Sequence, residues 1–202
     1  MEYDAFISYR HVERDAAVAG ALQRALEHYH IPAQIQKQTG IKKIRRVFRD
    51  REELSTNTDL AKTLDDALDH SKFLIVICSP DAKASQWVNR EVSLFLETHS
   101  MDKVLLLLTD GEPSSAFPER VFYDEKKEKD ADGNENVVRV PIEPMAADVR
   151  AETDSDRLKK LKTEKLRLIA DMLSCRFDDL KQRDREYRIR RAAFIGAGAA
   201  AL

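Results

Sequence analysis

FLIVIC, at residues 73–78, is the stretch that decides the fold, because every one of its side chains is apolar. A second run of this kind, VLLLL, occupies residues 104–108. Continuous apolar runs of this length are typical of strands in a parallel sheet that helices cover on both faces. The segment between them, from Ser85 to Thr98, carries apolar side chains at helical spacing and is predicted to be a helix that joins the two strands.

The alternation of strand and helix continues toward the N-terminus. We predict a first strand at Tyr3–Tyr9, a helix at Asp15–Tyr29 and a weakly patterned edge strand at Ile41–Phe48. The polar segment Arg49–Asp59 is predicted to be a loop, and a helix follows from Leu60 to His70. This order predicts an α/β fold, and right-handed crossovers favour a flavodoxin-like, doubly wound parallel sheet with the strand order 2-1-3-4-5.

The last third of the sequence is more polar. The charged run from Asp124 to Asn136 indicates either a surface hairpin or a disordered insertion, and the pattern leaves both open. Val137–Val140 is predicted to be the last strand of the sheet. Two helices are expected after it, an amphipathic one at Arg157–Leu173 and a more charged one at Phe177–Arg191.

These patterns divide the chain into three parts: an α/β domain at residues 1–150, a helical stalk at 151–191 and an apolar end at 192–202. The apolar end is about half as long as the roughly 20 residues that a membrane-spanning helix needs. Clustered arginines precede it, as expected on the cytosolic side of a membrane. We therefore expect the start of a truncated transmembrane helix, with a frayed, alanine-rich helix end as the alternative.

Composition narrows the classes of function. The net charge of -2 gives no support to nucleic-acid binding, and the basic run Lys42–Arg46 lacks interleaved aromatic side chains. Two cysteines, Cys78 and Cys175, cannot form a disulfide framework, so a cytoplasmic location is expected. No cysteine and histidine spacing indicates a metal site, and no glycine-rich phosphate loop follows the first strand.

The predicted topology places a ligand site beyond the carboxyl ends of the strands, beside the first strand, where the strand order reverses. Ser8, Tyr9 and Arg10 stand at that end of the first strand, and Ser79 and Pro80 follow the third.

One carboxylate in the predicted helix at 85–98 lies among apolar side chains. Glu91 falls on a helical stripe with Trp87, Leu94 and Phe95, which are apolar. Two interpretations are open from the pattern alone: a half-exposed or ion-paired glutamate at the edge of the stripe, or a carboxylate set there for chemistry.

Four short motifs resemble, in order and separation, those of Toll/interleukin-1 receptor (TIR) domains. They are FISYR at 6–10, FRD at 48–50, FLIVICSP at 73–80 and SQWVNREV at 85–92. The resemblance covers about Tyr3 to Pro141 and implies the TIR version of the flavodoxin-like fold.

The resemblance also implies roles for particular residues. Trp87 and Glu91 match the Trp-x-x-x-Glu motif on which the NAD-cleaving branch of the family carries its catalytic glutamate, so Glu91 is the catalytic candidate. The residues that the resemblance implies for substrate binding are Ser8, Tyr9, Arg10, Phe48, Asp50 and Trp87.

The segment after Asp50 resembles the BB loop of the family, which borders the site and takes part in self-association. The loop residues are Leu54, Ser55, Thr56, Asn57 and Thr58. The sequence departs from the family here, because the usual glycine, often beside a proline, is missing. Asn57 is the residue best able to adopt a positive φ in its place.

A single carboxylate is enough for the implied reaction. Nicotinamide leaves NAD as a neutral base and needs no protonation, so the remaining task is to stabilise an oxocarbenium-like ribose. The sequence therefore predicts a cytoplasmic signalling domain that hydrolyses or cyclises NAD, with NAD as substrate and no cofactor, and that associates with other TIR domains. The alternative is a non-catalytic TIR–TIR scaffold, and either could be anchored at the inner face of a membrane through residues 192–202.

Overall fold

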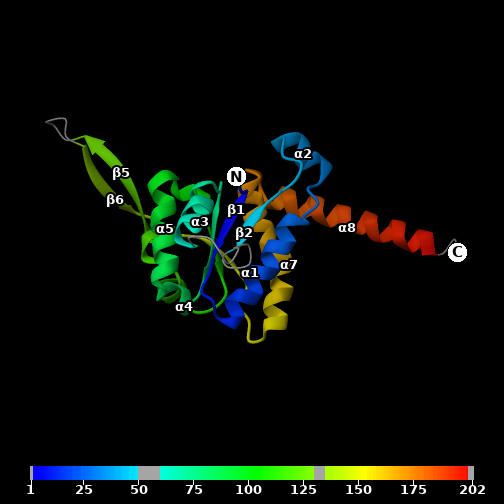
Figure 1. Cartoon of the computed structure of the whole chain (residues 1–202). Helices are drawn as coiled ribbons and strands as arrows, with labels where there is room; N and C mark the ends of the chain where they lie inside the picture. Colours follow the sequence, from blue (N-terminus) through cyan, green and yellow to red (C-terminus); the bar gives the residue numbers. More distant parts are fainter. Residues whose placement is uncertain (1, 50–59, 130–134, 200–202) are drawn as a thin grey trace.

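A computed structural model describes residues 2–49, 60–129 and 135–199 (Figure 1). A five-stranded sheet with the order β2-β1-β3-β4-β7 forms its centre, and every neighbouring pair in it is parallel. The strands are β1 (Ala5–Ser8), β2 (Val47–Arg49), β3 (Leu74–Cys78), β4 (Val104–Leu108) and β7 (Ala146–Asp148). The predicted flavodoxin-like, doubly wound arrangement is confirmed.

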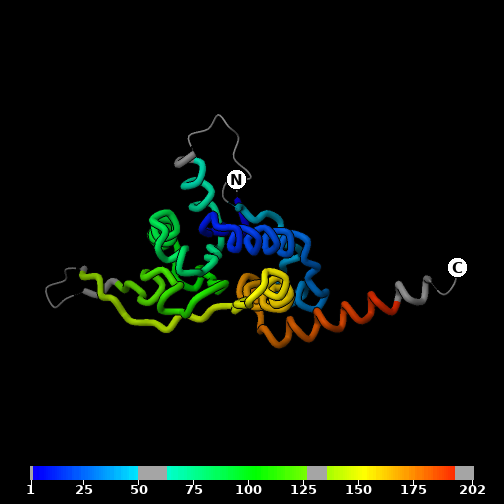
Figure 2. Tube along the Cα trace, turned by 90° about the horizontal axis from the view of Figure 1, so that it is seen from below, coloured from blue at the N-terminus to red at the C-terminus, as the bar shows by residue number. Residues whose placement is uncertain are grey.

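Helices cover both faces of the sheet, as the apolar runs in β3 and β4 require (Figures 1 and 2). α1 (Glu13–Glu27) and α7 (Asp154–Met172) pack on one face, where Ile7, Ile75 and Leu107 point. α3 (Leu60–Asp69) and α5 (Gln86–Thr98) pack on the other, where Phe6 and Val76 point. Shorter helical segments are α4 (Pro80–Lys83), η1 (Met101–Lys103), α6 (Pro113–Ala116) and η2 (Glu119–Phe122).

The second strand is shorter than predicted. A helix, α2 (Ala33–Thr39), precedes it and ends at Gly40, whose φ of +74° is a left-handed conformation that glycine adopts without strain. Ile44 is buried, but only Val47–Arg49 pair with β1. β2 lies at the edge of the sheet, as its basic flanking residues predicted.

The prediction that Val137–Val140 forms the last strand of the sheet is wrong. These residues belong to β6 (Glu135–Pro141), which pairs antiparallel with β5 (Tyr123–Lys129) in a separate two-stranded sheet. Of the two interpretations of the charged run from Asp124 to Asn136, the structure therefore contains the surface hairpin. The fifth strand is β7, whose AAD sequence is too short and too weakly patterned to signal a strand.

The helical stalk is predicted to begin at residue 151, but the first helix after that residue, α7, packs against the domain. α7 lies against α1 and places Leu161, Leu166 and Ile169 in the core between the helices and the sheet. Its first residues are exposed and charged, and Thr153 caps it by accepting a hydrogen bond from the Asp156 amide. α7 is thus part of the folded domain, because a parallel sheet needs helices on both faces.

We expect Ile169→Ala in α7 to lower the free energy of unfolding by about 2–4 kcal/mol, since it leaves a cavity at a fully buried site. Lys162→Ala on the exposed side of the same helix is the control and should change it by less than about 0.5 kcal/mol. Urea unfolding followed by circular dichroism measures both. Equal effects of the two substitutions would mean that α7 is not part of the core.

α8 (Phe177–Ala199) extends away from the domain toward the C-terminus (Figures 1 and 2). Its first turns are anchored by Leu180, which is fully buried, and by Tyr187, whose ring stacks on His30 at 4.3 Å between centroids. Among the described residues, no helix combines the length and the apolar character that crossing a membrane requires. The membrane anchor at 192–202, with the boundary before it, stays a prediction.

Candidate active site

Ser8 and Glu91 meet across the interface between the sheet and α5. Ser8 is the last residue of β1 and is fully buried, and Glu91 in α5 is 8% exposed. The Ser8 hydroxyl donates a hydrogen bond to Oε2 of Glu91 at 2.5 Å. Glu91 is therefore buried rather than half-exposed, and its orientation is set by a hydroxyl at the carboxyl end of the first strand.

The buried stripe of α5 is rotated by one residue from the predicted one. Val88, Val92 and Phe95 are buried with Glu91, whereas Trp87 is 63% exposed and Leu94 only partly buried. Successive side chains along a helix are turned by about 100° from each other. Because Trp87 and Val88 are adjacent and both apolar, the spacing alone does not show which of them faces the core. The prediction that Trp87 shares the buried face with Glu91 is wrong.

Local sequence explains where α5 begins and how it is held. Ser85 caps the helix, since its side chain accepts a hydrogen bond from the Val88 amide at 3.5 Å. Arg90 makes two hydrogen bonds of 2.9 Å to the Asp65 carboxylate in α3. The hydrogen bonds that Arg90 donates to Asp65 raise the pKa of Arg90. Burial lowers this pKa, and the negative charges of Asp65 and Glu91 raise it further. The arginine next to Glu91 is thus directed toward α3.

Arg10 and Trp87 line a shallow cavity of about 400 Å³. Its other lining residues are Asp81, Ala84, Ser85 and Gln86. Arg10 follows Ser8 by two residues, and Trp87 precedes Glu91 by one helical turn. An exposed indole and a guanidinium in one cavity are suited to a ligand that carries both a planar ring and phosphate groups. Tyr9 is buried, with its ring 4.7 Å from that of His11.

Phe48 lies in the core. It is 2% exposed and its ring stacks on Phe6, with 5.1 Å between centroids. Phe48 lies opposite Phe6 in β2, the strand beside β1, and it offers almost no surface to a ligand. Asp50 and the predicted self-association loop, Leu54 to Thr58, lie outside the described residues.

The structure also contains a buried polar cluster that the sequence analysis did not identify. Asp15, in the first turn of α1, is fully buried and accepts hydrogen bonds from three side chains. Ser79 after β3 donates at 2.6 Å, Thr109 after β4 donates at 2.9 Å, and Nε of Arg14 donates at 3.1 Å. One carboxylate thus joins the carboxyl ends of two central strands to the helix that follows the first. Polar residues directly after two apolar strands were the only signal in the sequence.

Two arginines extend this cluster. Arg14 also pairs with Asp81 at 3.0 Å and Asp110 at 2.8 Å. Burial works against its charge, but the hydrogen bond and charge of Asp15 and the charge of Asp110 outweigh burial, so the pKa of Arg14 is raised. Arg157 of α7 is buried and donates from Nε to the Thr109 carbonyl at 3.2 Å. Through Arg157, α7 is connected to the same edge of the sheet.

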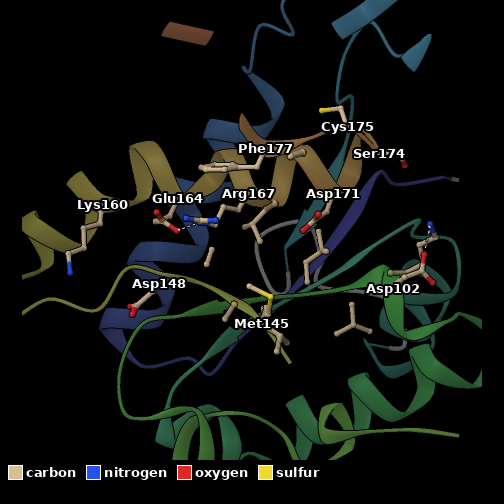
Figure 3. Close-up of a pocket in the computed structure, with 18 residues that line it drawn as sticks. Asp102, Met145, Asp148, Lys160, Glu164, Arg167, Asp171, Ser174, Cys175 and Phe177 are labelled. Carbon is tan, nitrogen blue, oxygen red and sulfur yellow. Dashed lines mark hydrogen bonds and ion pairs between the residues drawn. The ribbon is translucent and has the colours of Figure 1, made fainter. Parts of the chain in front are cut away.

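A groove larger than the cavity of Arg10 and Trp87 lies elsewhere. About 910 Å³ in volume, it is bounded by β4, β7, α7 and the start of α8, on the face of the sheet opposite to α5. Figure 3 shows Glu164, Arg167 and Asp171 on its helix side and Met145 on its sheet side. The groove contains none of the predicted site residues that the structure describes. Within the described ranges, no cluster of acidic, histidine or cysteine side chains is arranged to hold a metal ion.

Comparisons with known proteins agree with the motifs. A family model described as "TIR domain" matches residues 5–138, well over half of the chain. The chain is similar to a curated protein named NAD(+) hydrolase ApTIR from Actinoplanes sp., with 40% identity over 116 residues. That match covers 55% of this chain and 15% of the relative, so the chain spans only a small part of the length of that relative.

Among solved structures, the chain resembles one described as the activated Roq1 resistosome directly recognizing the pathogen effector XopQ (TIR domains). The identity is 26%, the match covers 56% of this chain and 61% of that chain, and the TM-score is 0.41.

Proposed function

The chain belongs to the TIR domain family, and on this premise we propose that it is a signalling domain that cleaves NAD with Glu91 as the catalytic carboxylate. The observation that carries the proposal is the buried Ser8–Glu91 pair at the carboxyl end of β1. The name of the similar Actinoplanes protein, an NAD(+) hydrolase, supports it.

Cleavage of NAD needs no general acid, because the nicotinamide leaving group does not have to be protonated. The bond between the ribose carbon and the nicotinamide nitrogen breaks, and its electron pair leaves with the nicotinamide, which becomes neutral. The positive charge passes to the ribose as an oxocarbenium ion, which water or another nucleophile then captures. A carboxylate beside that carbon stabilises the developing charge and can accept hydrogen bonds from the ribose hydroxyls.

Glu91 is suited to this role because its surroundings exclude water on one side. Val88, Val92 and Phe95 are buried on the same side of α5 as Glu91. A carboxylate with few competing water molecules acts more strongly on a nearby positive charge. Ser8 holds one carboxylate oxygen, so less reorganisation is needed when the oxocarbenium ion forms.

The remaining parts of NAD would lie over the cavity of Arg10 and Trp87. In this proposal the Arg10 guanidinium meets the pyrophosphate and the Trp87 indole stacks on a ring of the dinucleotide. Tyr9 and Phe48 support the site from the core and touch no substrate. Asp50 and residues 54–58 would border the site and contribute to self-association in the cytoplasm. A non-catalytic scaffold is not favoured, since it gives no reason for a buried Glu91.

We expect the purified chain to release nicotinamide from NAD, with a rate per molecule that rises with protein concentration, because a neighbouring copy would complete or order the site. Chromatography of nicotinamide measures the rate over a dilution series, and light scattering measures the mass of the protein at each concentration. The reaction products show whether ADP-ribose is released in linear or cyclic form.

Two outcomes would count against the proposal in different ways. No nicotinamide release at any concentration, from a folded chain that does associate, would favour the scaffold. A constant rate per molecule from a chain that remains monomeric would leave NAD cleavage in place and remove the dependence on self-association.

A further inference from the structure

The β5–β6 hairpin is a separate unit that projects from the domain at the end opposite to α8 (Figures 1 and 2). Its two strands pair with each other from Tyr123↔Pro141 to Lys129↔Glu135. No other described strand pairs with either of them, so each has an outer edge of backbone N–H and C=O groups without a strand beside it.

The base of the hairpin is fixed to the domain. Two guanidinium groups lie over the Tyr123 ring, with Arg120 at 4.8 Å and Arg139 at 4.6 Å from its centroid. Arg139 also pairs with Glu125 across the two strands, with 3.2 Å between Nε and Oε1. Arg120 of η2 therefore contacts the first residue of the hairpin, whereas the contacts of Arg139 lie within the hairpin.

The middle of β6 is apolar and uncovered. Val137 is 61% exposed and Val138 is 39% exposed, and neighbouring strand residues point to opposite faces. Neither face of the hairpin therefore has a covering layer at these positions. A two-stranded hairpin is marginally stable in water by itself, and further strands stabilise it.

The two outer edges differ in charge. Every residue of β5 from Asp124 to Lys129 is charged, and Lys126 and Lys127 are adjacent. Charged side chains of this kind, lysine above all, discourage another strand from pairing with an edge. In β6, the segment Asn136–Val140 carries a single charge, on Arg139. The edge of β6 lacks the protection that the edge of β5 has.

We propose that β6 pairs antiparallel with β6 of a second copy of this chain, about a two-fold axis that is perpendicular to the sheet and passes through the pair of Val138 residues. Val138 then lies opposite the partner's Val138 on one face, because the axis keeps each residue on its own face. Arg139 lies opposite the partner's Val137 on the other face, so no like charges face each other near the axis. The two hairpins form one four-stranded sheet, β5-β6-β6-β5.

This interface is separate from Ser8 and Glu91 and does not require NAD cleavage. It is tested without NAD, by the mass of the protein alone. Failure of the proposed catalysis therefore leaves it unaffected, and its failure leaves the catalysis unaffected.

Sedimentation equilibrium of the whole chain over a dilution series should show a monomer–dimer equilibrium. Val138→Lys should weaken dimerisation about tenfold or more, because it places two lysines directly opposite each other at the axis. Ile189→Lys is the matched control, since Ile189 in α8 is 59% exposed, and it should dimerise like the wild type. Circular dichroism checks that both variants are folded. A wild-type chain that stays monomeric throughout, or a folded Val138→Lys that dimerises like the wild type, would overturn the proposal.

Cross-linking tests the register. In a Cys175→Ser background, chains with Val138→Cys and chains with Val137→Cys are oxidised gently and separately. Val138→Cys should form a disulfide-linked dimer, whereas Val137→Cys should not, because only position 138 faces its own copy across the axis. Cross-linking of Val137→Cys to the same extent as Val138→Cys would contradict the two-fold axis stated above.

Discussion

Glu91→Gln is expected to lower the rate of nicotinamide release by about a hundred- to thousandfold, the usual effect of removing one preorganised electrostatic group from an active site. Glutamine has nearly the shape of glutamate, and its amide oxygen can still accept the hydrogen bond from Ser8. The substitution therefore removes the charge that would face the oxocarbenium ion and keeps the packing around Val88, Val92 and Phe95.

The matched control is Glu97→Gln on the same helix, where the side chain is exposed. It changes the net charge by the same amount and should leave the rate unaltered. Both variants are assayed by chromatography of nicotinamide at the protein concentration that gives the highest wild-type rate, and their folding is compared by circular dichroism. If folded Glu91→Gln cleaves NAD as fast as the wild type, the catalytic assignment is lost.

Asp15→Ala is expected to lower the free energy of unfolding by about 3 kcal/mol, because it removes the acceptor of the buried Ser79 hydroxyl and leaves the Thr109 hydroxyl with only the Cys78 carbonyl. Ser79 and Thr109 would lose the carboxylate, and Arg14 would keep only its two outer partners. The effect should be large since one carboxylate connects the carboxyl ends of β3 and β4 to α1.

Asp81→Ala is the control for this effect. Asp81 pairs with the same arginine, but its side chain is 54% exposed. Exposed ion pairs contribute about 0–1 kcal/mol, so we expect a much smaller loss of stability. Asp15→Asn should fall between the two, because its amide oxygen still accepts one hydrogen bond. Urea unfolding gives the midpoints, and an unchanged m value shows that the comparison is valid. Equal midpoints for Asp15→Ala and Asp81→Ala would mean that the buried Asp15 cluster does not stabilise the fold more than an exposed ion pair.

The central part of the fold could be predicted from the sequence because strands that are buried on both faces have continuously apolar sequences. β3 and β4 are apolar at every position, so their strand identity, their parallel pairing and the helices on both sides follow from composition and order alone. The carboxyl-end location of the candidate site follows from the same topology, and Ser8 and Glu91 meet there.

The errors have a common cause in contacts between distant parts of the chain. The sequence of β7 has no strand pattern, and β7 is a strand because it pairs with the edge of β4. The valines of β6 have a strand pattern, but they pair with β5 outside the main sheet. α7 has a highly charged sequence, and only its packing on α1 shows that it belongs to the core.

The sequence by itself determined the fold class and the identity of the catalytic candidate, because hydrophobic period and short motifs are local properties of the chain. The tertiary structure decided which way Trp87 faces, that Phe48 is a core residue, and that Asp15, Ser79 and Thr109 form one cluster. Asp15 and Thr109 are more than ninety positions apart in the sequence. Their hydrogen bond exists only because parallel strands bring their carboxyl ends to one edge of the sheet, and no local pattern records which polar side chains meet there.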